Sequence, residues 1–115
     1  MKKLFVLLTI VMLISACKKD YPKDIPQWVK DKIIHCKKTN DCCGHGFHPL
    51  HIYEYKNETS IVYIFSGDGE ITFDYYGNVL CDYYFGTWTC SPTYLQDNNY
   101  KKTREVWSED PDKCR

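Results

Sequence analysis

The sequence predicts an α+β domain, in which one N-terminal helix packs on an antiparallel meander of four to five strands held together by disulfide bonds. Three observations predict this fold class. Apolar residues recur at helical spacing over residues 26–38. Four short segments rich in β-branched and aromatic residues follow between residues 50 and 85. The chain also has 7 cysteines in 115 residues, as expected of a small domain whose apolar core alone gives marginal stability.

The helix is expected to run from Pro26 to Lys38, with Asp24 or Ile25 as its cap. Proline fits the first turn of a helix because its missing amide would be unpaired there. Two lysines at the end complement the negative end of the helix dipole, and residues 39–41 then end the helix. The side chains expected to face the sheet are Trp28, Val29, Ile33 and Cys36.

The expected strands alternate in side-chain character and are separated by short turns. They cover residues 50–55, 61–65, 70–75 and 79–85. The first strand places Ile52, Glu54 and Lys56 on one side and His51, Tyr53 and Tyr55 on the other. One face of the sheet is therefore expected to pack on the helix, while the other stays partly in contact with water.

The remaining residues predict smaller elements. Residues 87–90 are expected to add an edge strand, which would be the fifth, and Asn98-Asn99 is a turn or loop signal. Val106 and Trp107 are expected to form a final short element that Cys114 docks. Connections this short predict that consecutive strands pair as an antiparallel meander.

The start of the chain has the pattern of an export signal. Lys2 and Lys3 form a positive region, and an apolar stretch follows over residues 4–14. A helix of that stretch would span about 16 Å, roughly half of the ~30 Å hydrocarbon core of a bilayer. Residues 1–16 are therefore expected to be a cleaved signal peptide and not a membrane span.

The end of this signal, Ile14-Ser15-Ala16-Cys17, resembles the lipobox of bacterial lipoproteins. The resemblance implies that the Cys17 thiol is acylated and that the signal is cut just before it. The alternative is ordinary cleavage after Ala16, which would leave a free thiol. Two or three acyl chains anchor a protein stably, so we expect a protein lipid-anchored in the bacterial cell envelope, at the outer membrane, with residues 17–24 as a tether. Lys18-Lys19-Asp20 does not decide between the inward and outward leaflets.

The charge of the mature chain excludes one class of partner. Without residues 1–16 the chain has 99 residues, with 13 basic and 15 acidic side chains, and a net charge of about −2. Nucleic-acid phosphates favour clustered lysine and arginine, so no nucleic-acid partner is expected. A single α+β domain is expected over residues 25–115, acting as a monomer.

Assigning Cys17 to the anchor leaves an even number of cysteines. Export places them in an oxidising compartment, so three disulfides are expected. Six cysteines allow 15 pairings, and the 3 that join the adjacent Cys42 and Cys43 are discarded as strained. Cys81–Cys90 is a plausible bond across the last hairpin, but all twelve remaining pairings stay open. The candidates are Cys36, Cys42, Cys43, Cys81, Cys90 and Cys114.

The histidines form the one cluster of residues in the sequence that could bind a metal. All four lie within seventeen residues and are interleaved with three cysteines; they are His35, His45, His48 and His51. Imidazole and thiolate bind zinc and copper(I), so a His/Cys metal-binding lipoprotein is an alternative function. The spacing matches no zinc-finger pattern, and disulfides would remove the thiolates. We therefore expect no metal and no cofactor, with the histidines in a solvated loop.

Catalysis is not expected. A cysteine nucleophile paired with His45 or His48 needs a free thiolate, and the even count leaves none. The chain has no Gly-x-Ser-x-Gly, phosphate-binding glycine loop or His-Glu-x-x-His motif. No catalytic residue is assigned, and a small envelope hydrolase is the least favoured alternative.

Aromatic residues are in excess. Ten tyrosines and three tryptophans are more than one small core can bury, so some are expected to be exposed. Exposed tyrosine and tryptophan are enriched at binding hot spots. The open sheet face is therefore expected to bind a protein, peptide or glycan, or to serve a structural role in the envelope. The alternative is that cross-strand aromatic pairs only stabilise the sheet.

A second resemblance covers residues 25–81. Four segments resemble small, uncharacterised lipoproteins of Bacteroidetes: the helix start Ile25-Pro26-Gln27-Trp28-Val29, the strand segments His51-Ile52-Tyr53-Glu54-Tyr55 and Ile61-Val62-Tyr63-Ile64-Phe65, and Asp74-Tyr75-Tyr76-Gly77-Asn78-Val79-Leu80-Cys81. Relatives often have a cysteine pair after the second strand, where this chain has Ser66-Gly67-Asp68-Gly69. The resemblance implies location and fold, and no activity.

Overall fold

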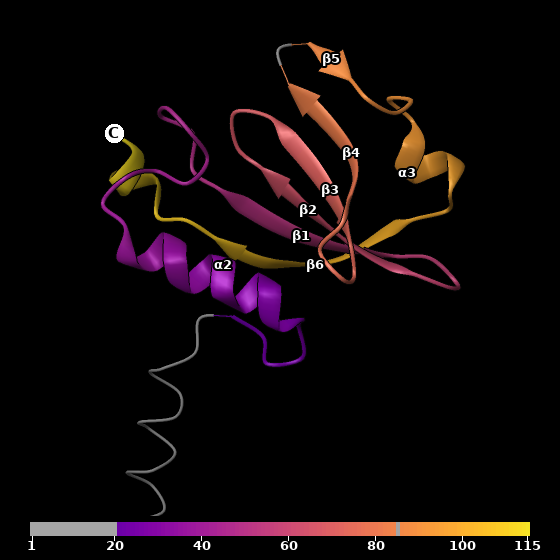
Figure 1. Ribbon diagram of the computed structural model, residues 1–115, viewed down its shortest axis with the longest axis horizontal. Coiled ribbons are helices and arrows are strands. Elements are labelled where there is room, and N and C mark those ends of the chain that lie inside the picture. The colour runs from indigo at the N-terminus through magenta and orange to yellow at the C-terminus, as the bar shows by residue number, and fades with distance from the viewer. Residues whose placement is uncertain (1–20, 85) are drawn as a thin grey trace, which may run out of the picture.

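The computed structural model describes residues 21–84 and 86–115 (Figure 1). In chain order the elements are α2 (Gln27–Lys38), β1 (His51–Lys56), β2 (Ile61–Ser66), β3 (Glu70–Asp74), β4 (Val79–Tyr84), β5 (Thr87–Trp88), α3 (Tyr94–Asp97), β6 (Lys101–Ser108) and the 3₁₀ helix η1 (Pro111–Cys114). The expected signal peptide, Cys17, residues 18–20 of the tether and Phe85 lie outside the described residues. Among the helices described, none is long and apolar enough to cross a membrane.

The α+β architecture is confirmed, but the expected strand count is wrong. The sheet has six antiparallel strands in the order β5-β4-β3-β2-β1-β6. Strands β1 to β5 form the expected meander, whereas β6 returns to the opposite edge and pairs with β1. The expected short element at Val106 and Trp107 is only the end of this eight-residue strand. The first half of β6 carries charged side chains, which an edge strand tolerates because one of its sides is in contact with water. Two register shifts against β1 interrupt the pairing.

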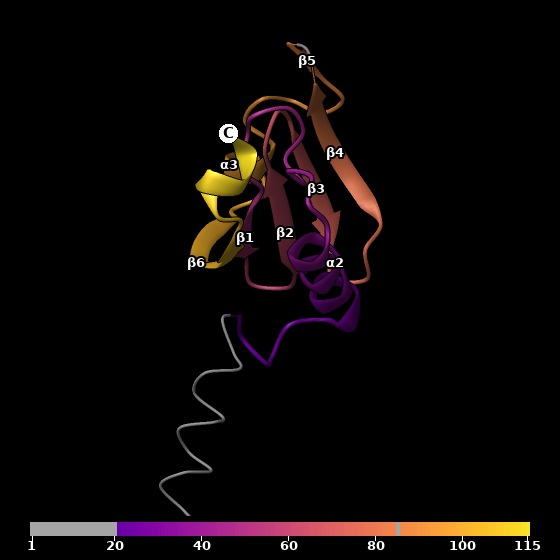
Figure 2. The same ribbon diagram turned by 90° about the vertical axis from the view of Figure 1, so that its left-hand side faces the viewer.

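Helix α2 packs on β1, β2 and β6. Its side chains Val29, Ile33 and Cys36 are completely buried and share one core cluster with Ile52, Tyr63, Phe65, Val106 and Trp107. Figure 2 looks along α2, with β6 on one side of the helix and β4 on the other. The strand alternation is confirmed, since Ile52 and Glu54 are buried while Tyr53 and Tyr55 are only half-buried.

The start of the helix differs from the expectation. Pro26 is the N-cap and precedes the first helical residue, and its carbonyl oxygen accepts from the amides of Val29 and Lys30. Neither expected cap acts as one. Ile25 is buried in the core, and the Asp24 carboxylate lies 3.1 Å from the Arg104 guanidinium of β6. The tertiary contacts of these two residues replace local capping.

Three disulfides cross-link the described part of the domain. Cys36–Cys43 joins the end of α2 to the loop that follows, and Cys42–Cys114 joins that loop to η1. The plausible Cys81–Cys90 bond is present and joins β4 to the segment after β5. The adjacent Cys42 and Cys43 therefore connect the helix end and the C-terminus through one loop.

Candidate functional site

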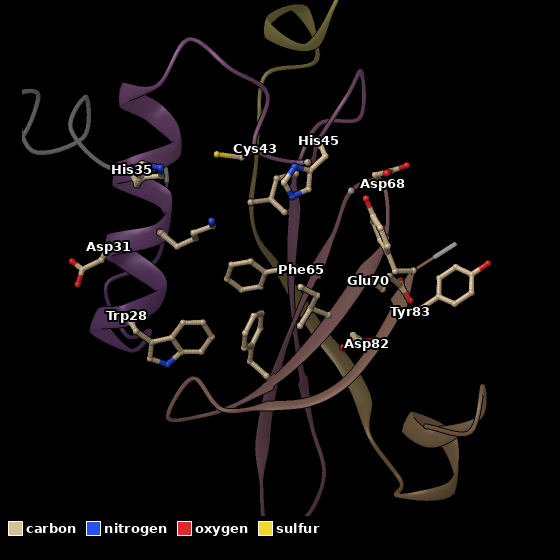
Figure 3. A pocket seen from close by; sticks show the side chains of 18 residues that line it. Trp28, Asp31, His35, Cys43, His45, Phe65, Asp68, Glu70, Asp82 and Tyr83 are labelled. Carbon is tan, nitrogen blue, oxygen red and sulfur yellow. The ribbon is translucent and has the colours of Figure 1, made fainter. Parts of the chain in front are cut away.

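A groove of about 770 Å³ lies between α2 and the strands β3 and β4. In the register of the sheet Ile71 is opposite Phe65 and Phe73 is opposite Tyr63, so both β3 side chains point to the helix side. Trp28 of the helix contacts Phe73, but α2 leaves Ile71 38% exposed. The groove is therefore the part of the helix-facing sheet surface that α2 leaves open (Figure 3).

The floor of the groove is built from three aromatic rings. The Trp28 ring stacks on Phe65 with a centroid distance of 5.7 Å and lies 5.2 Å from Phe73. Phe65 and Phe73 meet edge to face at 4.9 Å. The Trp28 Nε1–H donates to the carbonyl oxygen of Tyr75 at 2.8 Å, which fixes the indole. Gly77, at φ +94°, lies against the indole, where a Cβ would come within 3.2 Å of the ring. This floor is formed in advance, so a ligand would not have to order it.

The rim of the groove is polar. Its charged and imidazole side chains are Asp31, Lys32, His35, His45, Asp68, Glu70 and Asp82. Asp68 comes from the β2–β3 turn, and its amide donates to the carbonyl oxygen of Gly44 at 2.7 Å. His45 has a φ of 69°, which is uncommon for a residue other than glycine. A groove of about 770 Å³ with an apolar floor and a few polar groups around it has the character of a ligand site. Such sites typically have volumes of about 300–1,000 Å³.

The four histidines do not converge. His35 and His45 line the groove, whereas His48 Nε2 lies 3.6 Å from Asp68. His51 Nδ1 lies 3.3 Å from Glu105, and its ring stacks beside Tyr53 on the other face of the sheet. Among the described residues no histidine belongs to a group of three possible ligands, so the hypothesis of a His45/His48/His51 metal site gains no support from this geometry.

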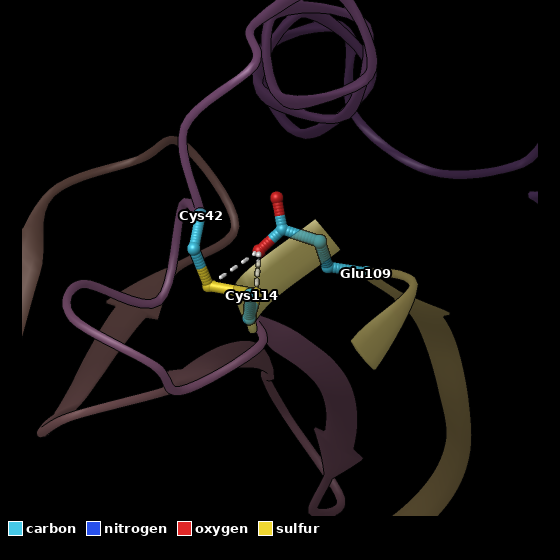
Figure 4. Close-up of side chains that lie close together, drawn as sticks. All are labelled: Cys42, Glu109 and Cys114. Carbon is cyan, nitrogen blue, oxygen red and sulfur yellow. Dashed lines mark hydrogen bonds between the residues drawn. A yellow bond between two sulfur atoms is a disulfide. The ribbon is translucent and has the colours of Figure 1, made fainter. Parts of the chain in front are cut away.

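One group of three possible metal ligands is present in residues 21–84 and 86–115. Its atoms, from Cys42, Glu109 and Cys114, lie within 4.8 Å of one another (Figure 4). The two sulfurs are joined in a disulfide, and each lies close to Glu109 Oε1, at 3.5 and 3.7 Å. Disulfide sulfur lacks the negative charge of the thiolate that metals bind, so the oxidised group is not a complete ligand set.

Glu109 is a buried carboxylate that holds the loop at one end of the groove. It accepts hydrogen bonds from the amides of Cys43, at 2.9 Å, and Leu50, at 3.1 Å, and from Lys113 Nζ at 2.8 Å. Burial raises its pKa, but these hydrogen bonds outweigh burial and lower the pKa below its ordinary value. Sequence reasoning missed this residue, because it lies outside any apolar pattern.

A second buried carboxylate, Glu54, lies among β1, β2 and β6. It accepts from Thr103 Oγ1 at 2.7 Å, Tyr63 OH at 3.0 Å and Arg104 Nη2 at 3.0 Å. Burial again raises the pKa, and the three hydrogen bonds outweigh it and lower the pKa. Burial and the neighbouring Glu54 carboxylate raise the pKa of Tyr63. Glu54 is buried and both of its carboxylate oxygens accept hydrogen bonds from neighbouring strands, so this cluster has the character of a structural network.

The exposed aromatic residues are not gathered at the centre of the open sheet face. Tyr53 there is half-buried, and Lys102 Nζ lies 4.2 Å above its ring. Val62 and Ile64 on this face are buried, and Tyr94 and Tyr100 from the β5–β6 connection line a second hollow beside Val62. The expectation that some tyrosines are exposed is confirmed at other places, by Tyr75, Tyr76 and Tyr84.

The chain was compared with known proteins. No model of a protein family matches it, and no curated protein and no solved structure is significantly similar to it.

Proposed function

We propose that this protein is a lipid-anchored protein of the bacterial cell envelope whose domain binds an apolar ligand in the groove between α2 and strands β3 and β4. The observation that carries the binding role is the packed aromatic floor of Trp28, Phe65 and Phe73, beside which Ile71 on the helix side of the sheet is 38% exposed. The proposed site is on the helix side of the sheet and not on its open face. The histidine–cysteine metal site and the hydrolase stay predictions from the sequence, without an observation in their favour.

The anchor is supported by the cysteine pattern. Six of the seven cysteines are joined in three disulfides, which leaves the lipobox residue Cys17 as the remaining thiol for acylation. Two or three acyl chains are enough for stable attachment to a bilayer. The domain then works at the membrane surface as a monomer.

The anchor is tested by replacing Cys17 with serine. Because serine cannot form the thioether of a lipoprotein, the Cys17→Ser variant is expected to move from the detergent-rich phase to the aqueous phase in a Triton X-114 partition. Its intact mass is expected to lack the acyl groups that the wild-type protein carries. Wild-type mass without lipid, or a variant that still partitions with detergent, would contradict the proposed anchor.

The groove is tested with a neutral apolar dye, N-phenyl-1-naphthylamine. We expect the protein to bind the dye with enhanced emission, and the Ile71→Lys variant to raise the Kd by at least about tenfold, or ~1.4 kcal/mol. The reason is that the lysine ammonium would have to lose water beside the aromatic floor. Ile71 is partly exposed, so the change is compatible with folding.

A matched control separates the groove from general stickiness. Tyr76 is apolar and 81% exposed, but it does not line the groove. The Tyr76→Ser variant is expected to keep the wild-type affinity for the dye. Equal affinity in the wild type and the Ile71→Lys variant, with both folded by circular dichroism, would place dye binding elsewhere.

A further inference from the structure

The groove between α2 and strands β3 and β4 has an excess of negative charge at its rim. The strand side contributes three carboxylates and, among the described residues that line it, no basic side chain; the three are Asp68, Glu70 and Asp82. The helix side contributes Asp31 and one lysine, Lys32. A cleft with one sign of charge in excess attracts ligands of the opposite sign. The position of each carboxylate decides which of them a ligand would meet.

Asp82 is the strand carboxylate that lies on the groove side of the sheet. In the register of the sheet Asp82 is opposite Ile71, and Ile71 is opposite Phe65, so the three side chains form one row on the helix side. Side chains directly opposite each other in an antiparallel pair have Cβ atoms about 4.5–5.5 Å apart. The Asp82 side chain therefore borders the apolar floor beside the exposed part of Ile71.

The other carboxylates of the rim are directed elsewhere or have a partner. Figure 3 shows Asp31 on the side of α2 that is turned away from the strands. Glu70 precedes the groove-facing Ile71 in β3, so strand alternation places its side chain on the other face of the sheet. Asp68 lies 3.6 Å from His48 Nε2. Asp82 is thus the carboxylate that a ligand on the floor would meet first.

The Asp82 carboxylate is half-buried, and none of the ion pairs formed within residues 21–84 and 86–115 includes it. Its backbone is held in place, because its amide donates to Thr89 Oγ1 at 2.7 Å and its carbonyl oxygen accepts from the Thr89 amide at 2.9 Å. The neighbouring Cys81–Cys90 disulfide closes the same segment. Partial burial reduces the screening of this charge by water, so a cation placed beside it would be attracted more strongly than at an exposed carboxylate.

Lys32 does not cancel this attraction. It lies one helical turn after Trp28 on the groove side of α2, but its side chain is exposed and no ion pair joins it to Asp82. Water and salt screen an exposed charge more than a half-buried one. The electrostatic field over the floor beside Ile71 is therefore set mainly by the Asp82 carboxylate.

We infer that the groove takes small apolar ligands that carry one positive charge, as aromatic and aliphatic amines do. The apolar body lies on the floor of Trp28, Phe65 and Phe73, and the ammonium group lies beside Asp82. An ammonium group has N–H donors for the carboxylate oxygens, and such charge-assisted hydrogen bonds are stronger than neutral ones. The inference rests on the proposed binding role of the groove and adds the charge of the ligand. It is independent of the lipid anchor.

The inference is tested by isothermal titration calorimetry with three naphthalene probes that differ in charge. Naphthylmethylamine is a cation at pH 7, naphthalenemethanol is neutral and naphthaleneacetate is an anion. The Cys17→Ser protein is used, because it has no acyl chains into which the probes could partition. We expect the amine to bind at least about fivefold more tightly than the alcohol, or ~1 kcal/mol, and the acetate to bind more weakly than the alcohol. Added salt should reduce the preference for the amine.

Two replacements of a carboxylate by an amide separate Asp82 from the overall charge of the protein. The Asp82→Asn variant keeps the side-chain shape, so it should bind the alcohol as before and the amine no more tightly than the alcohol. The Asp31→Asn variant is the matched control, because Asp31 is exposed and its carboxylate accepts from Gln27 Nε2 at 2.9 Å. It should keep the preference for the amine. Loss of the preference in both variants, or in neither, would overturn the role of Asp82.

The Ile71→Lys variant distinguishes failure of the charge preference from failure of the groove. If the amine and the alcohol bind equally and Ile71→Lys weakens both, the groove is the binding site and the inferred charge preference is wrong. If Ile71→Lys binds all three probes with unchanged affinity, or if no probe binds to the parent protein, the proposed groove and the inference are both wrong. Circular dichroism checks that each variant keeps the fold.

Discussion

Replacing Glu54 by alanine is expected to lower the free energy of unfolding by about 3 kcal/mol, measured by urea denaturation at pH 7. The variant leaves Tyr63 OH and Thr103 Oγ1 without their buried acceptor and removes one carboxylate from Arg104. The loss is placed at the lower end of the range for broken buried ion pairs, because the Arg104 side chain is 31% exposed and keeps Asp24. The Glu54→Gln variant keeps the side-chain volume and should fall between the wild type and Glu54→Ala.

Asp24 offers a matched control for this effect. Its carboxylate contacts the same Arg104 Nη2 at 3.1 Å, compared with 3.0 Å for Glu54, but its side chain is 74% exposed while that of Glu54 is 3% exposed. Solvent screens an exposed ion pair, so Asp24→Ala should leave the free energy of unfolding nearly unchanged. Similar losses in both variants would show that burial does not set the strength of this network.

The two buried carboxylates, Glu54 and Glu109, predict how stability depends on pH. The pKa values of Glu54 and Glu109 are lowered in the folded protein, so below their unfolded values the unfolded chain binds more protons than the folded one. Their stabilising contribution is complete above the unfolded pKa of about 4.3 and is lost as the pH falls through the lower folded values. Glu54→Gln should therefore lose less stability than the wild type between pH 5 and pH 3.

Local pattern was sufficient to predict most of the fold. The helix and strands β1 to β4 follow from apolar spacing and from turns such as Gly77-Asn78, and all were placed within a few residues of their bounds. The full length of strand β6 was not predicted, because Lys101, Lys102 and Arg104 give no apolar alternation. An edge strand pairs through its backbone on one side only, so its side chains can be charged and its sequence resembles a loop.

The groove could be predicted only in part. An excess of aromatic residues indicated exposure, but the surface expected to bind a ligand was the open face of the sheet and not the helix side. A helix is about 10 Å wide, whereas strands are about 4.8 Å apart, so one helix covers roughly two to three strands of a sheet. Which strands it covers depends on tertiary contacts such as those of Trp107 and Val29. Of the buried acids, the alternation in β1 placed Glu54 on the same side as Ile52 without indicating which side faces the helix, while no signal marked Glu109.

Removing the Cys42–Cys114 disulfide is expected to cost more stability than removing Cys81–Cys90. The bonds close loops with sequence separations of 72 and 9 residues. Loop-closure entropy gives losses of about 4.4 kcal/mol and about 2.6 kcal/mol for the paired alanine variants. Guanidinium denaturation of the two double variants, Cys42→Ala/Cys114→Ala and Cys81→Ala/Cys90→Ala, measures the difference, which should be about 2 kcal/mol.

The two double variants also report on what each bond holds in the folded state. Cys42 belongs to the loop that Glu109 holds through the amides of Cys43 and Leu50, and those hydrogen bonds do not need the disulfide. Because loop-closure entropy acts on the unfolded chain, removing a disulfide should leave the folded structure in place, and both variants should keep the native circular dichroism spectrum. A larger loss for the Cys81–Cys90 variant would mean that this bond stabilises the packing of the β5–β6 connection directly. Thiol titration without reductant should find no reactive thiol among the four remaining structural cysteines of either double variant, and two or more would contradict the pairing.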